Sequence, residues 1–189
     1  MPRFTASSAR FVRAFELAAD WHGGQKKKAS SAPYVSHLMA ISSLVMEDGG
    51  TEDEAIAGLL HDVIEDCGAG YRESIKNEFG EIVLGIVEGC TDSDRIPKPP
   101  WRKRKEAWLS RLQEADESVC RVAVSDKLHN VRSMIADHQI VGKKLWLRFR
   151  GREEGTKWYY SEVSKILNRK LNSRNSLSLQ KAVNQLNAL

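Results

Sequence analysis

Residues 51–66 constrain the fold more than any other stretch, because they join a helix start signal to apolar residues at helical spacing. Thr51 and Glu54 form a capping box, in which each side chain satisfies a backbone N–H of the other residue at the start of the helix. The apolar positions recur every three or four residues at Ala55, Ile56, Leu59, Leu60, Val63 and Ile64. The pattern predicts one helix that packs against other elements.

The same period continues elsewhere, and alternation long enough for a β-strand is absent from the sequence. Helical spacing covers residues 72–89, 103–114 and 117–136, and Pro33 opens another helix. Short loops rich in glycine or proline separate these segments, at residues 49–50, 68–70 and 95–97. We therefore expect an all-α helical bundle.

The length of 189 residues fits one domain spanning residues 1–189, with a core from about residue 8 to 170. Residues 171–189 are polar at first and then helical in pattern, which predicts either a short added helix or a frayed tail. The sequence has neither the apolar core of a secretory signal nor a run of about 20 apolar residues, so we expect no membrane span and a cytoplasmic location.

Four polar residues interrupt the apolar pattern of residues 51–66. These are His61, Asp62, Glu65 and Asp66, which occupy positions i, i+1, i+4 and i+5. Residues four apart are neighbours on a helix, so the stripe forms two layers of potential ligands or acids. Burial of such groups is costly unless they are paired or bind a metal, so a solvent-exposed stripe is the alternative interpretation.

Two other helices carry residues of the same chemistry. His37 falls in the first turn of the helix after Pro33, and Asp126 and Asn130 lie four apart in an apolar helix. Histidines and aspartates together suit a divalent ion such as Mn, Fe, Co or Zn. The three cysteines have no CxxC spacing, so we expect reduced, mostly buried thiols rather than a structural zinc site.

An isolated His, then His-Asp, then a distal Asp resembles the HD superfamily of metal-dependent phosphohydrolases. The segments HGGQKKK…PYVSH, LLHDVIED, VEGCTD and SDKLHNVR are similar to the hydrolase domain of RelA/SpoT proteins, especially the small alarmone hydrolases related to the metazoan SpoT homologue. The resemblance covers residues from about 10 to 170. It implies an HD-domain helical bundle and removal of the 3′-pyrophosphate from ppGpp or pppGpp, with Mn²⁺ as the usual ion.

The resemblance also implies roles for particular residues. The metal ligands would be His37, His61, Asp62 and Asp126. Glu65 and Asp66 would be the catalytic acidic pair, and Asn130 would lie in the nucleotide pocket. Two adjacent carboxylates can titrate as a coupled pair, so the choice of base between them stays open. The length leaves no room for a synthetase half, so the resemblance implies degradation of the alarmone only.

A substrate with two diphosphate groups requires basic residues outside the metal site, and the chain has basic clusters at residues 26–28 and 98–105. The resemblance places Lys27 and Lys98 against the nucleotide and adds Arg152 as a phosphate contact. Lys27 departs from the family, which usually has arginine there, and lysine cannot stack on guanine as a planar guanidinium does. Most other lysines are expected to be solvated.

Several aromatic residues and histidines are predicted to be structural. His22 ends an alanine-rich helix and is expected to be hydrogen-bonded rather than a ligand, and His129 and His138 are placed outside the site as well. The cluster at residues 158–160 is expected to pack the last helix of the core onto the bundle rather than to stack on a base.

Two alternatives remain beside alarmone hydrolysis. One is an HD-superfamily phosphatase acting on another nucleotide, such as NADPH or a deoxynucleotide, which the lysine at position 27 leaves open. The other is a non-catalytic nucleotide- or RNA-binding module. The Glu65–Asp66 pair argues against that module, and the net charge of +4 attracts a polyanion without identifying one, so we expect no nucleic-acid partner. The oligomeric state is left open.

Overall fold

The computed structural model describes residues 8–27, 31–95 and 97–189. Within these ranges the chain is helical, as expected. The described residues contain no β-strand, and their one β-type pairing is an isolated bridge between Lys26 and Pro33. The elements are α1 (Ala9–Trp21), α2 (Val35–Glu47), α3 (Glu52–Leu60), α4 (Val63–Asp66), α5 (Tyr71–Phe79), α6 (Glu81–Cys90), α7 (Trp101–Glu114), α8 (Glu117–Val141), the 3₁₀ helix η1 (Gly142–Arg148), α9 (Arg152–Leu171) and α10 (Arg174–Asn187). The described part of the chain has no helix long and apolar enough to cross a membrane.

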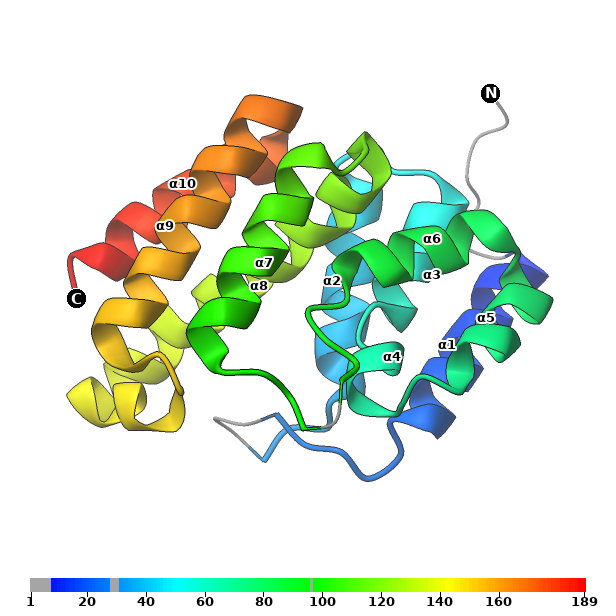
Figure 1. The fold of residues 1–189 in the computed structure, drawn as a ribbon, viewed down its shortest axis with the longest axis horizontal. Helices are drawn as coiled ribbons and strands as arrows, with labels where there is room; N and C mark the ends of the chain where they lie inside the picture. The colour runs from blue at the N-terminus through cyan, green and yellow to red at the C-terminus, as the bar shows by residue number, and fades with distance from the viewer. Residues whose placement is uncertain (1–7, 28–30, 96) are drawn as a thin grey trace.

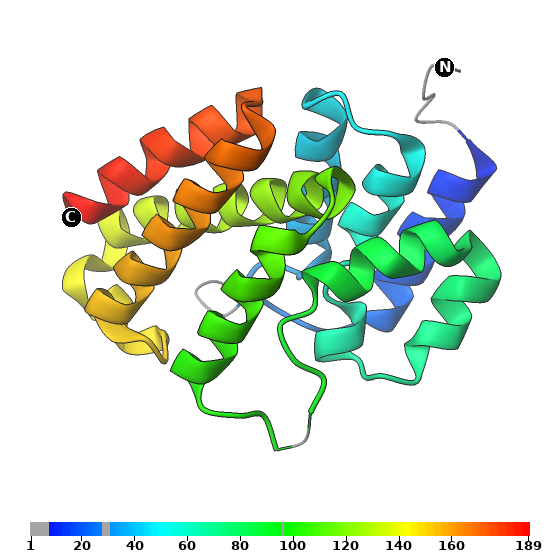
Figure 2. The same ribbon diagram turned by 45° about the horizontal axis from the view of Figure 1, so that its top comes forward.

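Two hydrophobic clusters form the interior, and α8 belongs to both. One is built from α1 to α6 with Val119 and Val122 of α8. The other joins α7, η1, α9 and α10 to the remaining apolar face of α8. Figure 1 shows α1, α5 and α6 on one side of the molecule and α9 and α10 on the other, and in Figure 2 the long α8 passes behind α7 and α9. The 25 residues of α8 therefore connect the two halves of the bundle.

A close approach between α2 and α3 brings two predicted site helices together. A Cβ added to Gly58 of α3 would lie 3.2 Å from the Cα of Ser42 in α2, and the Ser42 hydroxyl donates a 2.8 Å hydrogen bond to the Ala55 carbonyl. The missing side chain at position 58 therefore lets the two helices pack backbone to backbone. The predicted capping box at Thr51 and Glu54 is present and starts α3.

The prediction of one helix over residues 72–89 is wrong at Gly80. That residue has φ 89°, a conformation that favours glycine, and it ends α5 and precedes α6. Apolar spacing alone misses this break because both helices bury residues of the same cluster.

The C-terminal segment forms the buried helix α10 rather than a frayed tail. Its start is fixed by a capping box between Ser173 and Ser176, and Leu179, Val183 and Leu186 pack into the second cluster. The side-chain amide of Asn175 donates to the Leu44 carbonyl of α2 at 2.8 Å and to the Ser125 hydroxyl of α8 at 3.2 Å. This helix thus packs on the core that the sequence placed before residue 171.

Candidate active site

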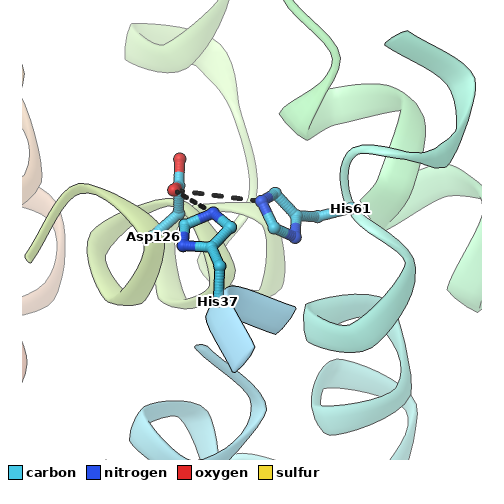
Figure 3. A group of neighbouring side chains, drawn as sticks. All are labelled: His37, His61 and Asp126. Atoms are coloured by element: carbon cyan, nitrogen blue, oxygen red, sulfur yellow. Dashed lines mark ion pairs between the residues drawn. The ribbon is translucent and has the colours of Figure 1, made fainter. Parts of the chain in front are cut away.

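The central feature of the site is a buried group of three potential metal ligands from three helices. His37 comes from the first turn of α2, His61 directly follows α3, and Asp126 lies in the middle of α8. One ligand atom of each lies within 4.8 Å of the others. Figure 3 shows both imidazole rings directed towards the Asp126 carboxylate, whose Oδ1 lies 3.4 Å from His37 Nε2 and 3.8 Å from His61 Nε2.

Asp62 adds a second carboxylate to this group. Its Oδ2 lies 3.0 Å from His61 Nε2 and 3.8 Å from His37 Nε2, and it accepts a short hydrogen bond from the Tyr34 hydroxyl. Tyr34 therefore fixes the orientation of Asp62. Tyr34 belongs to the PYVSH segment, and the sequence alone indicated no role for it.

The helix predicted over residues 51–66 is interrupted where it carries these ligands. Helix α3 ends at Leu60, His61 and Asp62 form a turn, and α4 begins at Val63. Apolar residues on both sides of the turn are buried in the first cluster, so the hydrophobic spacing continues across the break. The predicted helical relation between residues four apart is kept for one of the two pairs, because the Asp66 N–H donates to the Asp62 carbonyl at 2.8 Å.

The donor set fits a divalent cation. His61 Nδ1 bonds the Gly58 carbonyl at 3.0 Å, while its buried Nε2 makes no hydrogen bond despite the nearby carboxylates. A buried polar atom without a partner is costly unless something else satisfies it. Two imidazole nitrogens and two carboxylates around one point can hold a divalent ion at this position.

Burial and neighbouring carboxylates shift the pKa values of the two histidines in opposite directions. Burial lowers the pKa of His37 to about 4 against the opposing pull of Asp126. Burial also disfavours protonated His61, but Asp62 and Asp126 together outweigh it and raise the pKa to about 9. Burial opposes ionisation of Asp62 too, yet His61 holds the pKa of that carboxyl well below its usual range. The cluster thus keeps its carboxylates charged and ready for a cation.

The two predicted catalytic carboxylates lie beside the metal group, and each is held by a different partner. Glu65 accepts from Lys98 Nζ at 2.9 Å and from the Asp92 N–H at 3.4 Å. Asp66 accepts from the Gln25 side-chain amide at 2.8 Å. Both line the same cavity as His37, Asp62 and Asp126.

That cavity has a volume of about 500 Å³, large enough for a nucleotide. Among the described residues its wall includes eight Lys or Arg and six Asp or Glu side chains. A divalent ion would add two positive charges to this excess. The cavity is therefore suited to a polyanion.

Three of the four predicted substrate residues lie at this cavity. Lys27 lines it and donates to the Ser133 hydroxyl at 3.1 Å, Lys98 bonds Glu65, and Asn130 Nδ2 donates to Asp126 Oδ1 at 2.5 Å. Lys28, from the same basic cluster as Lys27, lies outside the described residues.

Arg152 is not brought to the cavity. It has φ 52°, and its guanidinium donates to the Leu147 carbonyl at 3.0 Å, while Arg148 and Arg150 line the wall instead. Arg152 was the residue predicted from this segment, but the backbone where η1 passes into α9 decides which arginine faces the cavity, and helical spacing cannot predict that.

Two partly buried lysines at the cavity were not predicted as site residues. Lys127 forms a short ion pair with Asp126 and lies 4.8 Å from the centre of the Trp108 ring. Lys105 bonds Asp92 Oδ2 at 2.9 Å and faces the Tyr159 ring. Burial lowers the pKa of Lys105, while the carboxylate of Asp126 overcomes burial and raises that of Lys127. Both line the cavity, and the sequence held two signals for them: Lys105 belongs to the basic cluster at residues 98–105, and Lys127 directly follows the predicted ligand Asp126.

Of the three remaining histidines, two have structural contacts as expected and one contacts the site. His22 Nδ1 lies 2.7 Å from Gln25 Oε1, as a structural histidine would, and His138 packs on Trp146. His129 differs from the expectation, because its Nδ1 lies 2.8 Å from Nδ1 of His37. This contact joins residues 92 positions apart, so the spacing of α8 alone gave no sign of it.

The aromatic cluster of α9 packs as expected and also reaches the site. Tyr159 lies against Trp101 and Trp108, and Arg102 covers the ring of Trp158. Tyr159 and Tyr160 line the cavity as well. They add aromatic surface to the cavity wall.

Residues 14–152 match the HD domain family, and the chain belongs to that family. HD domains bind divalent metals, and the buried group described above is a possible metal site. The family consists of metal-dependent phosphohydrolases, and its helical fold is the one observed here.

Within the HD family, individual relatives show that the chain belongs to the RelA/SpoT-type HD-domain hydrolases. The chain is 34% identical over 136 residues to a guanosine-3′,5′-bis(diphosphate) 3′-pyrophosphohydrolase of Drosophila melanogaster, covering 69% of this chain and 72% of the relative. It is 33% identical over 135 residues to a GTP pyrophosphokinase of Streptomyces coelicolor, covering 70% of this chain but only 16% of that longer protein.

A solved structure gives the same result across the whole fold. It belongs to a metazoan orthologue of SpoT that hydrolyses ppGpp, and it superposes with a TM-score of 0.81 at 25% identity, covering 98% of this chain and 100% of that one. The resemblance to metazoan SpoT homologues is thereby confirmed.

Proposed function

We propose that this chain is a guanosine-3′,5′-bis(diphosphate) 3′-pyrophosphohydrolase that converts ppGpp or pppGpp, with water, into GDP or GTP and pyrophosphate. The observation that carries the proposal is the position of the Glu65–Asp66 pair beside the buried His and Asp group, at one cavity with an excess of basic residues. The names of the relatives supply the substrate.

In this proposal His37, His61, Asp62 and Asp126 hold the metal, and Mn²⁺ is the ion we expect. When bound, a divalent ion supplies Lewis-acid chemistry, since it lowers the pKa of water and neutralises phosphate charge. Tyr34 and Gly58 assist by orienting Asp62 and His61 through hydrogen bonds.

Glu65 and Asp66 handle the proton in the reaction. Water attacks the phosphorus attached to the 3′ oxygen, the bond between them breaks, and the 3′ oxygen takes up a proton. One carboxylate of the pair accepts the proton that the attacking water loses. Lys98 and the Asp92 N–H orient Glu65, and Gln25 orients Asp66, so both are held beside the ligands without being ligands themselves.

The basic residues bind the phosphates. Lys27 and Lys98 are proposed contacts, with Asn130 beside Asp126 in the nucleotide pocket. Arg152 was the fourth candidate, and its place at the cavity is taken by Arg148 and Arg150. The proposed ligand is a small guanine nucleotide and not a nucleic acid.

A second candidate substrate is kept because of Lys27. The ammonium of Lys27 bonds Ser133, and a lysine offers no planar group to stack on guanine. Weaker selection for guanine would admit another nucleotide, such as NADPH or a deoxynucleotide, to the same phosphatase site.

The experiment is hydrolysis of ppGpp with added Mn²⁺, run in parallel with NADPH, dGTP and a plain 3′-phosphonucleotide, measuring pyrophosphate and orthophosphate separately. Pyrophosphate and GDP from ppGpp, lost on chelation and in Glu65→Ala, are expected. Orthophosphate from another substrate alone would overturn the alarmone assignment in favour of the second candidate. Absence of any turnover in the metal-loaded chain would overturn both.

A further inference from the structure

His129 makes a direct contact with a proposed metal ligand. It lies on α8 three residues after Asp126, and its Nδ1 is 2.8 Å from His37 Nδ1, a hydrogen-bond distance. The ring centroids are 4.9 Å apart and the planes are inclined by 48°, so the rings meet through their nitrogens and are not stacked.

The two nitrogens of His37 face different partners. Nε2 lies 3.4 Å from Asp126 Oδ1 and 3.8 Å from Asp62 Oδ2, whereas Nδ1 faces His129. A histidine that binds a metal through Nε2 must have a free electron pair there, so its proton sits on Nδ1. That Nδ1–H then donates to His129 Nδ1, and His129 carries its own proton on Nε2.

His61 provides an internal comparison, because it is held in the same way by a different acceptor. Its Nε2 faces the carboxylates, and its Nδ1 bonds the Gly58 carbonyl at 3.0 Å. In His37 the acceptor is a second imidazole from another helix. Outer partners of this kind fix the tautomer and ring orientation of metal-binding histidines.

We propose that His129 is a positioning residue that holds His37 in the tautomer and orientation required for binding a divalent cation. Helix α8 thus supplies one ligand, Asp126, and orients a second ligand from α2. The inference rests on the proposed function, since it takes His37 as a ligand.

The first test is a titration of Mn²⁺ into the metal-free full chain by calorimetry. His129→Phe keeps an aromatic ring but removes the acceptor, and we expect Mn²⁺ to bind about 10- to 100-fold more weakly. His129→Asn presents an amide oxygen near the former Nδ1, and it should restore affinity to within about threefold of the original chain. His138→Phe, which removes another imidazole from α8, is the matched control and should bind Mn²⁺ as the original chain does.

Turnover measured at different Mn²⁺ concentrations distinguishes a positioning role of His129 from a purely structural one. The activity of His129→Phe should be low at limiting Mn²⁺ and return to most of the original kcat at saturating Mn²⁺. Unchanged Mn²⁺ affinity in a folded His129→Phe would overturn the proposal, and so would a loss of kcat that excess Mn²⁺ does not restore.

A measurement on the unmodified chain keeps the proposal testable if His129→Phe does not fold. Nitrogen NMR of the imidazoles in the Zn²⁺-loaded chain should show the proton of His37 on Nδ1 and that of His129 on Nε2, and the opposite tautomer at His37 would refute it. His37→Ala separates the two proposals. If it retains Mn²⁺, the proposed metal site fails, and if it loses Mn²⁺ while His129→Phe does not, only the role of His129 fails.

Discussion

The two ends of the cavity are built in different ways. The acidic end consists of buried side chains from three packed helices, with side-chain exposures of 4% for His37, 2% for His61 and 8% for Asp126. The basic end consists mostly of exposed or partly exposed lysines and arginines, several from the segments between helices, such as Lys27, Lys98 and Arg150, with Arg104 as a buried exception. Buried groups in fixed geometry suit chemistry, whereas solvated cations on loops suit the capture of substrates that differ in detail.

The strongest test of this contrast uses two aspartates of α8. Asp126→Ala removes a buried carboxylate that we propose binds the metal, and we expect loss of bound metal and a fall in kcat of about ten-thousandfold, since a metal ion contributes several kcal/mol to phosphoryl chemistry. Asp137→Ala changes the same residue type at the cavity wall and should leave the metal content unchanged. Metal analysis and ppGpp hydrolysis measure both, and equal effects of the two substitutions would remove the distinction between the ends.

The second test addresses the boundary between the two ends, where Glu65 pairs with Lys98. Glu65→Gln should keep the metal and lower kcat by about a hundred- to a thousandfold, because it removes a proton acceptor and no ligand. Glu88→Gln on α6, which breaks only a surface pair with Arg72, is the control. Near-normal kcat in Glu65→Gln would contradict its catalytic role.

The third test changes a residue of the basic end only and measures substrate binding. Lys27→Arg restores the planar cation of the family, and it should lower KM for ppGpp about two- to fivefold at unchanged kcat, in line with the strength of an exposed cation–π contact. Lys103→Arg, on the exposed face of α7, should leave KM unchanged. An unchanged or higher KM in Lys27→Arg would refute stacking at this position.

The smallest effect concerns the stability of the fold at the start of α3, where Glu54 does not line the cavity. Burial would raise the pKa of Glu54, but the Thr51 N–H, Ser118 and Arg121 lower it below the ordinary value of 4.5. A lowered folded-state pKa gives stability that is present above about pH 4.5 and is lost as the pH falls through the folded-state value. Glu54→Gln should therefore reduce the free energy of unfolding by about 1–2 kcal/mol at pH 7. Denaturant titrations should show the difference between the two chains shrinking below pH 4.5, and a pH-independent difference would exclude this linkage.

The sequence predicted the helices well because each one buries an apolar face. It also named His37, His61 and Asp126, which the structure brings together, since residue type and order within helices carry that information; their roles as metal ligands stay predictions. Breaks at Gly80 and after Leu60 were missed, because apolar spacing runs across both. The basic end was predicted less well: Arg152 was chosen where Arg148 and Arg150 face the cavity, and the conformation of an irregular segment depends on packing that spacing does not encode. The contact between His37 and His129 was out of reach for the same reason, since it forms only when α2 and α8 pack together.

The hydrogen bonds of Asn175 have a consequence for the far end of the chain. One amide on α10 joins α2 to α8, the helices that carry His37 and Asp126, and it bonds Ser125, the immediate neighbour of Asp126. Preorganisation of the ligands is thus coupled to the docking of the C-terminal helix. The affinity for metal should therefore depend on whether residues 174–187 are folded against the core. Truncation of the chain at residue 172 should weaken Mn²⁺ binding although it removes none of the proposed ligands.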